Sequence, residues 1–231
     1  MLFSGDESRA KSANARLRVD SVLQHLADRF EIKGALGSGA YATVYRAFDK
    51  RLEREVAVKI LHMESAMDPD AQLRFEREAK TLCSLNHPNI VRILSFGLVS
   101  NHVPYMVSEF LDGNNLKELL FANGALSAQE TKRLALEACK GLQFMHEHSI
   151  LHRDLKPDNV FVCKNGDLKL IDLGLCGFMG GYEAGAMSLT STGIVVGTVG
   201  HMSPERIRGE KLDGRSDLYS LGCVIYECLI N

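Results

Sequence analysis

The stretch HRDLKPDN, residues 152–159, is followed after twelve residues by Asp172-Leu173-Gly174, and these two motifs decide the fold. An isolated aspartate in a loop is most often a solvated carboxylate. Here two acidic residues, a lysine and an asparagine lie at short fixed spacings between apolar strands. Such a set supplies two metal ligands, one proton acceptor and one phosphate contact. The sequence therefore predicts a site that handles a polyphosphate.

The chain around these motifs is mainly helical. Its strongest helix covers residues 127–148 and opens with a capping box at Ser127. Short apolar strands are expected at residues 160–162 and 168–171, and a last helix from about Ser216 to the end.

The first half of the chain reads as β-structure. Runs of β-branched and aromatic residues, separated by glycines or charged turns, predict antiparallel strands, and one stretch of good helix formers interrupts them. The expected strands are 30–36, 42–48, 55–61, 91–97 and 102–110, and the expected helix is 71–85. A β-rich half joined to a helical half predicts an α+β fold of two lobes with a cleft between them.

Residues 1–29 form a leader of different character. Leu17, Val22, Leu26 and Phe30 recur at about helical spacing in a polar background. Two interpretations stay open: a short amphipathic helix that packs on the domain, or a disordered segment.

Composition limits the class of protein. The 231 residues are 45 % hydrophobic and carry a net charge of −2, which favours a buried core and argues against binding to nucleic acid. No stretch approaches the roughly 18 apolar residues of a membrane-spanning helix, and the N-terminus is too polar for a secretory signal. The six scattered cysteines are expected to be reduced thiols, so we expect a cytoplasmic protein with no membrane segment in this chain.

A glycine-rich stretch, GSGAYATV at residues 37–44, is a weak signal by itself, because a plain hairpin explains it equally well. A dinucleotide-binding fold would need a helix directly after this loop, whereas another strand follows. Lys59 lies at the end of the stretch VAVK, residues 56–59, in the strand expected at residues 55–61. It also has a plain interpretation as a surface lysine. However, it is flanked by Val58 and Ile60 in an otherwise apolar run.

Taken in order, these motifs resemble the eukaryotic-type (Hanks-type) protein kinases, and most of all the Ser/Thr kinases of bacteria. The resemblance covers residues 30–231 and implies a bilobal, protein-kinase-like α+β fold. The small lobe, an antiparallel sheet plus one helix, would comprise residues 30–111 with the hinge. The large, mostly helical lobe would comprise residues 112–231. The matching segments are 37–44, 56–59, Glu78, 152–159, 172–174, 197–198, 203–205 and 217–222.

The resemblance also implies a binding site for ATP. Lys59 would contact the α- and β-phosphates and pair with Glu78 from the helix of the small lobe. The residues that would contact the nucleotide are Leu36, Gly37, Ser38, Gly39, Ala40, Val44, Ala57, Lys59, Ser108, Glu109, Leu111 and Phe161.

The remaining groups would carry the chemistry of a Ser/Thr protein kinase that transfers the γ-phosphoryl group of ATP to protein hydroxyls. Asp154 would accept or orient the proton of the substrate hydroxyl, and Lys156 would stabilise the transferring group. Asn159 and Asp172 would bind Mg²⁺. Lys156, two residues after Asp154, is the pattern of Ser/Thr rather than Tyr specificity. Leu173 replaces the usual phenylalanine of the metal-binding triplet but remains an apolar plug.

Regulation and partners follow from the same resemblance. The expected partners are protein substrates. Arg153 precedes the catalytic aspartate, and such an arginine usually binds a phosphorylated residue, so autophosphorylation is expected at Thr190 or Thr192. A merely flexible polar loop is the alternative. His201 stands where an aromatic residue is common, and the sequence offers no account of it.

The family continues with several helices beyond the one that contains residues 217–222, so the sequence is expected to be C-terminally incomplete. The alternative function is therefore an inactive nucleotide-binding or scaffold fragment. The last helix is apolar nearly all round and needs covering from more than one side. We expect the chain by itself to be poorly soluble and weakly active or inactive.

Overall fold

The computed structural model describes residues 22–39, 42–61, 69–99, 103–173 and 199–231. The leader before residue 22, Ala40, Gly174, Thr190 and Thr192 lie outside the described residues. The chain divides into two compact units. The first unit comprises residues 1–79 and 93–110, and the second comprises residues 80–92 and 111–231.

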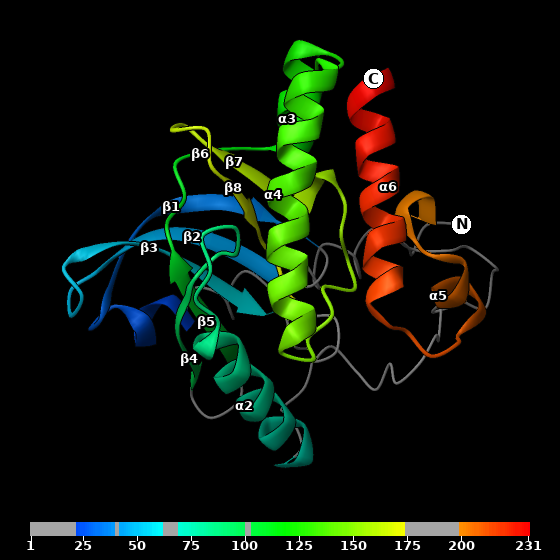
Figure 1. Ribbon diagram of the computed structural model, residues 1–231. Helices are drawn as coiled ribbons and strands as arrows, with labels where there is room; N and C mark the ends of the chain where they lie inside the picture. Colours follow the sequence, from blue (N-terminus) through cyan, green and yellow to red (C-terminus); the bar gives the residue numbers. More distant parts are fainter. Residues whose placement is uncertain (1–21, 40–41, 62–68, 100–102, 174–198) are drawn as a thin grey trace, which may run out of the picture. The chain divides into compact units, whose positions relative to one another are not determined.

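The first unit is built on a five-stranded antiparallel sheet (Figure 1). Its strand order is β1-β2-β3-β5-β4, and the predicted strands are confirmed with small shifts at their ends. The strands are β1 (Phe30–Ser38), β2 (Ala42–Asp49), β3 (Arg54–Leu61), β4 (Ile93–Val99) and β5 (Val103–Glu109).

One face of this sheet is covered by the end of the leader. Residues 22–26 form a helical turn, and Val22 and Leu26 are each 6 % exposed. They pack in one cluster with alternate residues of the strands, among them Val56 and Val58. The described part of the leader is thus the packed amphipathic segment, the first of the two interpretations.

Helix α2 (Pro69–Ser84) follows the third strand, as predicted. The last residues of α2 and the segment after it, residues 80–92 together, belong to the second unit, a division that differs from the single break expected between residues 111 and 112. Hydrogen bonding explains the difference. The side chain of Asn89 donates to the carbonyl of Leu168, 3.0 Å away, and Ile90 forms a β-bridge with Leu170.

The second unit contains a small sheet and several helices. Within this unit α4 and α6 pack side by side (Figure 1). The strands are β6 (Gly113–Asn115), β7 (Val160–Cys163) and β8 (Leu168–Leu170). The α-helices are α3 (Leu116–Asn123), α4 (Ala128–Glu147), α5 (Pro204–Arg208) and α6 (Gly214–Ile230), and the 3₁₀ turns are η1 (Pro157–Asn159) and η3 (Val199–His201).

The dipeptide Asp112-Gly113 is typical of a turn, and neither β6 nor α3 was predicted from the sequence. Gly113 serves close packing instead, because a Cβ there would lie 2.2 Å from the carbonyl oxygen of Val162 on the neighbouring strand. A signal for α3 was present in the sequence. Asn115 and Glu118 form a capping box, with the backbone N–H of Glu118 donating to the side-chain oxygen of Asn115.

Helix α6 is apolar on more than one side, as predicted. Leu221 and Val224 are buried, whereas Leu218, Tyr226 and Leu229 are between 45 % and 65 % exposed. None of the helices among the described residues has the length and apolarity that crossing a membrane requires.

A buried ion pair joins the leader to the sheet. Asp49 is fully buried, and its Oδ2 accepts two hydrogen bonds from Arg29, at 2.7 and 3.0 Å. Its Oδ1 accepts from the backbone N–H groups of Arg51 and Leu52. Burial by itself would raise the pKa of Asp49, but these bonds hold the pKa below its ordinary value.

We expect Asp49→Asn to destabilise the chain by about 3 kcal/mol, because it leaves the Arg29 guanidinium without its buried partner. Since the folded pKa of Asp49 is depressed, its contribution is present above the unfolded value of about 3.9 and is lost as the pH falls through the folded value. Urea unfolding from pH 7 to pH 3 measures both effects. The control Glu55→Gln removes an exposed partner of Arg46 and should change stability by less than about 0.5 kcal/mol; an equal effect would refute the role of Asp49.

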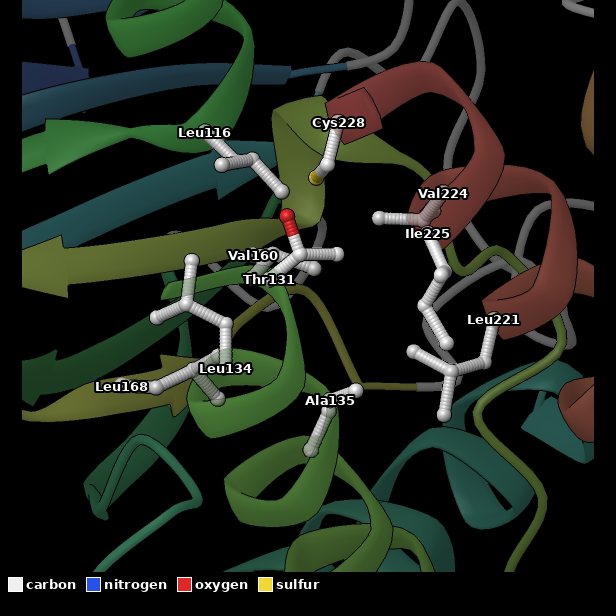
Figure 2. A pocket seen from close by; sticks show the side chains of 11 residues that line it. Leu116, Thr131, Leu134, Ala135, Val160, Leu168, Leu221, Val224, Ile225 and Cys228 are labelled. Atoms are coloured by element: carbon white, nitrogen blue, oxygen red, sulfur yellow. The ribbon is translucent and has the colours of Figure 1, made fainter. Parts of the chain in front are cut away.

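A small cavity lies between α4 and α6, with about 10 Å³ of room for the centre of a water molecule. Its lining is apolar except for Thr131, whose hydroxyl oxygen points toward the side chains of Leu116 and Cys228 (Figure 2). Among the described residues this buried hydroxyl has no hydrogen-bond partner. A water molecule needs two to four polar partners, so one hydroxyl does not hold it.

Thr131→Val should therefore stabilise the chain by about 1 kcal/mol, since it replaces an unpaired buried hydroxyl with a methyl group of similar size. Thr131→Ser is the matched control. It keeps the hydroxyl, removes the methyl group and should destabilise. Thermal unfolding of the three proteins tests this order, and a less stable valine variant would mean that the hydroxyl is paired.

Candidate active site

The candidate residues of the first unit form a row across its sheet. Gly37 pairs with Val44, Val44 pairs with Lys59, and Lys59 pairs with Met106, so these four positions lie side by side on β1, β2, β3 and β5. Directly paired residues of antiparallel strands point to the same face. Lys59 therefore lies on the face opposite to the cluster that contains Val58.

Ala57 and Ser108 form the next pair of the same face, two residues from Lys59 along β3. Both side chains are half-buried, as are those of Val44 and Lys59. This face thus offers a small, partly apolar surface that also carries two cations, Lys59 and, paired with Ala57, Arg46.

The described residues on either side of the glycine-rich turn, at the end of β1 and the start of β2, are hydrogen-bonded to one another, and Gly37 is exposed. The N–H of Gly39 donates to the carbonyl of Ala42 at 2.9 Å, and the hydroxyls of Ser38 and Thr43 lie 3.0 Å apart. A Cβ at Gly37 would meet no described heavy atom within 4 Å. Leu36 is 52 % exposed, so the start of the turn also presents uncovered apolar surface.

For three predicted residues, Glu109, Leu111 and Glu78, the structure gives the position in the chain but no contact that bears on a nucleotide site. Glu109 ends β5, paired with Val56, and Leu111 follows in the second unit; both are half-buried. Glu78 lies in α2, but its side chain is outside the described part of the structure, so its ion pair with Lys59 stays a prediction.

The catalytic loop of the second unit is held by its own side chains. Asp154 Oδ2 lies 2.9 Å from Lys156 Nζ and 3.1 Å from Asn159 Nδ2. Asn159 Nδ2 also donates to the backbone carbonyl of Asp154 at 2.7 Å. The proton acceptor, the cation and the amide predicted from the sequence are therefore brought together in one hydrogen-bonded set.

Asp172 is tied to this set through the backbone of its neighbour. The N–H of Ile171 donates to the carbonyl of Asn159 at 3.0 Å. The carbonyl of Ile171 accepts from Nε2 of His152 at 3.1 Å. His152 is fully buried, and burial lowers its pKa, so the ring is neutral and Nε2 carries its proton. Leu173, the apolar plug, is only 2 % exposed.

The backbone at the predicted active site is strained. Arg153 has φ of 66° and Asp172 has φ of 60°, both in the left-handed region that residues other than glycine seldom adopt. Such strain persists only where surrounding bonds determine the conformation, and it clusters at functional sites.

Asp217 supplies the bonds that determine the conformation at Arg153. It is 2 % exposed at the start of α6, and its carboxylate accepts from the backbone N–H groups of His152 and Arg153, each at 2.9 Å. Nε2 of His146 lies 2.8 Å from the same carboxylate. The sequence analysis assigned no role to Asp217. The available signal was a carboxylate in the first turn of an otherwise apolar helix.

The donor set fits a magnesium–nucleotide complex. Asn159 is oriented through its amide nitrogen, which leaves the amide oxygen as the atom to offer a metal, and Asp172 adds a carboxylate. Magnesium prefers oxygen ligands of this kind. Phe161, predicted to contact the adenine, is half-buried in β7.

Known proteins are similar to this chain in sequence and in fold. The chain is 42 % identical over 209 residues to the serine/threonine-protein kinase PknB of Mycolicibacterium smegmatis, covering 89 % of this chain and 33 % of that protein. It is 43 % identical over 209 residues to a probable serine/threonine-protein kinase of Streptomyces coelicolor, covering 89 % of this chain and 31 % of the relative. The chain thus spans about a third of the length of these relatives.

A solved structure agrees. Rad53 residues 1–466 in complex with AMP-PNP superimposes with a TM-score of 0.69 and 30 % identity, covering 87 % of this chain and 48 % of that one. The predicted kinase-like fold and the resemblance to bacterial Ser/Thr kinases are therefore confirmed. A family model described as the protein kinase domain matches residues 30–231, nearly all of the chain, which thus belongs to the protein kinase family.

Proposed function

We propose that this chain is a Ser/Thr protein kinase domain that transfers the γ-phosphoryl group of Mg·ATP to hydroxyl groups of proteins. The observation that carries the proposal is the bonded set of Asp154, Lys156 and Asn159 on the strained loop beside Asp217. The similarity to bacterial Ser/Thr kinases supports it.

Each residue has a role in this reaction. Asp154 accepts or orients the proton of the attacking hydroxyl, and Lys156 neutralises charge on the transferring group. Asn159 and Asp172 would hold Mg²⁺, which would supply positive charge to the phosphates. Because phosphoryl transfer depends on position and charge, the hydrogen bonds that fix this loop contribute directly to the rate.

In the first unit, Lys59 binds the α- and β-phosphates, and Glu78 is its proposed partner. The exposed backbone at Gly37 and Gly39 lets amide groups approach the phosphates. Val44 and Ala57 provide apolar surface for the adenine, and the backbone of Glu109 one of its hydrogen bonds. Phe161 and Leu111, which belong to the second unit, are further adenine contacts that the resemblance to protein kinases implies.

The scaffold alternative is less well supported. That alternative, an inactive nucleotide-binding or scaffold fragment, rests on the expected C-terminal incompleteness and not on the loss of a catalytic group. Asp154, Lys156, Asn159 and Asp172 are all present, and the first three are hydrogen-bonded to one another.

The test is phosphoamino-acid analysis. The chain is incubated with γ-labelled ATP, Mg²⁺ and a basic protein that contains serine, threonine and tyrosine. Labelled phosphoserine or phosphothreonine is expected, because Lys156 follows Asp154 by two residues. Label on tyrosine alone would contradict the proposed specificity.

Autophosphorylation is a further expected result. Mass spectrometry should find phosphate on Thr190 or Thr192, since the side chain of Arg153 is exposed and can pair with a phosphate. The double Thr→Ala variant should lose most of its activity and keep its affinity for ATP. Phosphate found only in residues 1–29 would refute the assignment.

A further inference from the structure

The side chain of Arg46 lies over the first residue after β5. Its guanidinium carbon, Cζ, is 4.6 Å from the centre of the Phe110 ring, which is the geometry of a cation–π contact. Two of its nitrogens donate to Glu55: Nε to Oε1 at 2.9 Å and Nη2 to Oε2 at 2.8 Å. This bidentate ion pair fixes the plane of the guanidinium on the ring. Arg46, Glu55 and Phe110 together form an arginine clamp.

The arginine clamp lies beside the surface proposed for the adenine. Arg46 on β2 pairs with Ala57 on β3, and Ala57 pairs with Ser108 on β5, so these three side chains point to one face of the sheet. Glu55 lies two residues before Ala57 in the same strand and therefore shares this face. Phe110 lies two residues after Ser108. The clamp thus connects β2, β3 and the end of β5, which are neighbours in the sheet (Figure 1).

Phe110 marks the point where the hydrogen bonds of the sheet end. The last pair between β3 and β5 joins Val56 to Glu109. Residues 110–112 belong to no strand. Phe110 directly follows Glu109, whose backbone is proposed to hydrogen-bond the adenine. The contact with Arg46 therefore restrains the chain one residue beyond the ladder, next to the proposed hydrogen bond.

The partners of Arg46 argue against a direct contact with the phosphates. Nε and Nη2 already donate to Glu55, and this carboxylate repels an anionic ligand. The side chains of Arg46 and Glu55 are 45 % and 39 % exposed, and such an ion pair contributes little to stability. What the pair provides is orientation. A planar guanidinium binds a carboxylate with its edge and covers a ring with its face, which an ammonium group does not do.

We propose that Arg46 is a positioning residue for the nucleotide: held by Glu55, it packs on Phe110 and keeps the backbone of Glu109 oriented toward the adenine. The proposal rests on the proposed kinase function, because ATP is the ligand that supplies the adenine. It concerns the affinity for the adenosine part of ATP, not the transfer step or the binding of the protein substrate.

Calorimetry with adenosine, ADP and a non-hydrolysable analogue of ATP tests the clamp without phosphoryl transfer. In Arg46→Met the dissociation constants of all three ligands should rise by the same factor, about two- to fivefold, which corresponds to the 0.5–1 kcal/mol of an exposed cation–π contact. The KM for ATP should rise by the same factor, whereas kcat and the KM for the protein substrate should stay near those of the parent chain. Thermal unfolding establishes that the variant is folded.

Matched variants separate the ring from the charge. Phe110→Leu should weaken adenosine binding as much as Arg46→Met does, and the double variant should add little, because both residues act through one contact. Phe110→Tyr keeps the ring face and should bind adenosine within about 1.5-fold of the parent chain. Arg46→Lys keeps the charge but loses the fork to Glu55, so its affinity should stay closer to that of Arg46→Met. The control Lys33→Met removes another exposed cation, the partner of Glu31, and should change no dissociation constant.

The outcomes separate the clamp from the kinase function. A parent chain that binds adenosine but transfers no phosphate refutes the kinase function alone, and the binding data then decide the role of Arg46. A parent chain that binds none of the three ligands refutes both. Where the parent chain binds, an unchanged affinity for adenosine in Arg46→Met overturns the role of Arg46.

Two further results would also overturn it. A loss of affinity confined to ADP and the ATP analogue would mean that Arg46 acts on the phosphates. Equal defects in Phe110→Tyr and Phe110→Leu would mean that the face of the ring is not what Arg46 holds.

Discussion

Asp172→Asn and Lys59→Met should each reduce phosphoryl transfer by a factor of about 10² to 10³ or more, because each removes a charge that acts on the metal or the phosphates. Asp172 has φ of 60°, and asparagine adopts this region as readily as aspartate, so the substitution adds no backbone strain. Lys59 lies on the sheet face opposite to the cluster around Val58, so its replacement leaves that cluster intact.

Two measurements are needed for these variants. Steady-state transfer gives the loss of rate, and thermal unfolding should give transitions close to that of the parent chain. The double variant should be little worse than either single variant, since groups that act as a unit are not additive. Near-parental turnover in either single variant would contradict the assignment of its residue.

Asp217→Asn should produce the second largest effect, on stability and activity together. Its amide group would direct hydrogens at the N–H of His152 or Arg153, and His146 would lose its charged partner. We expect a loss of about 3 kcal/mol, from hydrogen bonds to a charged group that are worth about 1.5–3 kcal/mol each. A displacement of the catalytic loop by about 1 Å should also lower kcat about 100-fold.

Asp213→Asn is the matched control for Asp217→Asn. Asp213 is exposed and caps α6 by accepting from the backbone N–H of Arg215, whose side chain, with this bond, lowers the pKa of Asp213 to about 2. Asparagine caps a helix as well as aspartate does, so stability should change by less than about 0.5 kcal/mol. Equal losses of stability in Asp217→Asn and Asp213→Asn would contradict the claim that the buried hydrogen bonds of Asp217 cause the effect.

The sequence predicted the elements whose own residues carry a periodic pattern. In the strand that contains Val58, successive residues alternate between a buried face and a more exposed face. The start of α4 is marked in the sequence by the capping box at Ser127. The first interpretation failed at Gly113, where glycine marks a close approach of two strands and not a turn. Local pattern does not distinguish these two uses of glycine.

That Asp154, Lys156 and Asn159 lie together could be predicted because they fall within one motif of a few residues. Contacts between distant parts of the chain could not. Asp217 reaches the backbone of His152 across 65 residues, and His201 reaches Glu227 across 26. Sequence pattern marks Asp217 as a carboxylate in an apolar helix, but it does not say which residue Asp217 or His201 contacts, so only the folded chain reveals the pairing.

The measurement that tests the central claim most directly compares two labels. The chain is incubated with ATP labelled at the γ- or at the α-phosphate, with Mg²⁺ or with a chelator, beside its Asp172→Asn variant. The account predicts that each molecule of the chain transfers several labelled γ-phosphoryl groups to protein serine or threonine. Label from the α-phosphate should not be transferred, and neither the chelator-treated chain nor the variant should transfer label. Binding of ATP without transfer by the parent chain, or equal transfer by the variant, would contradict it.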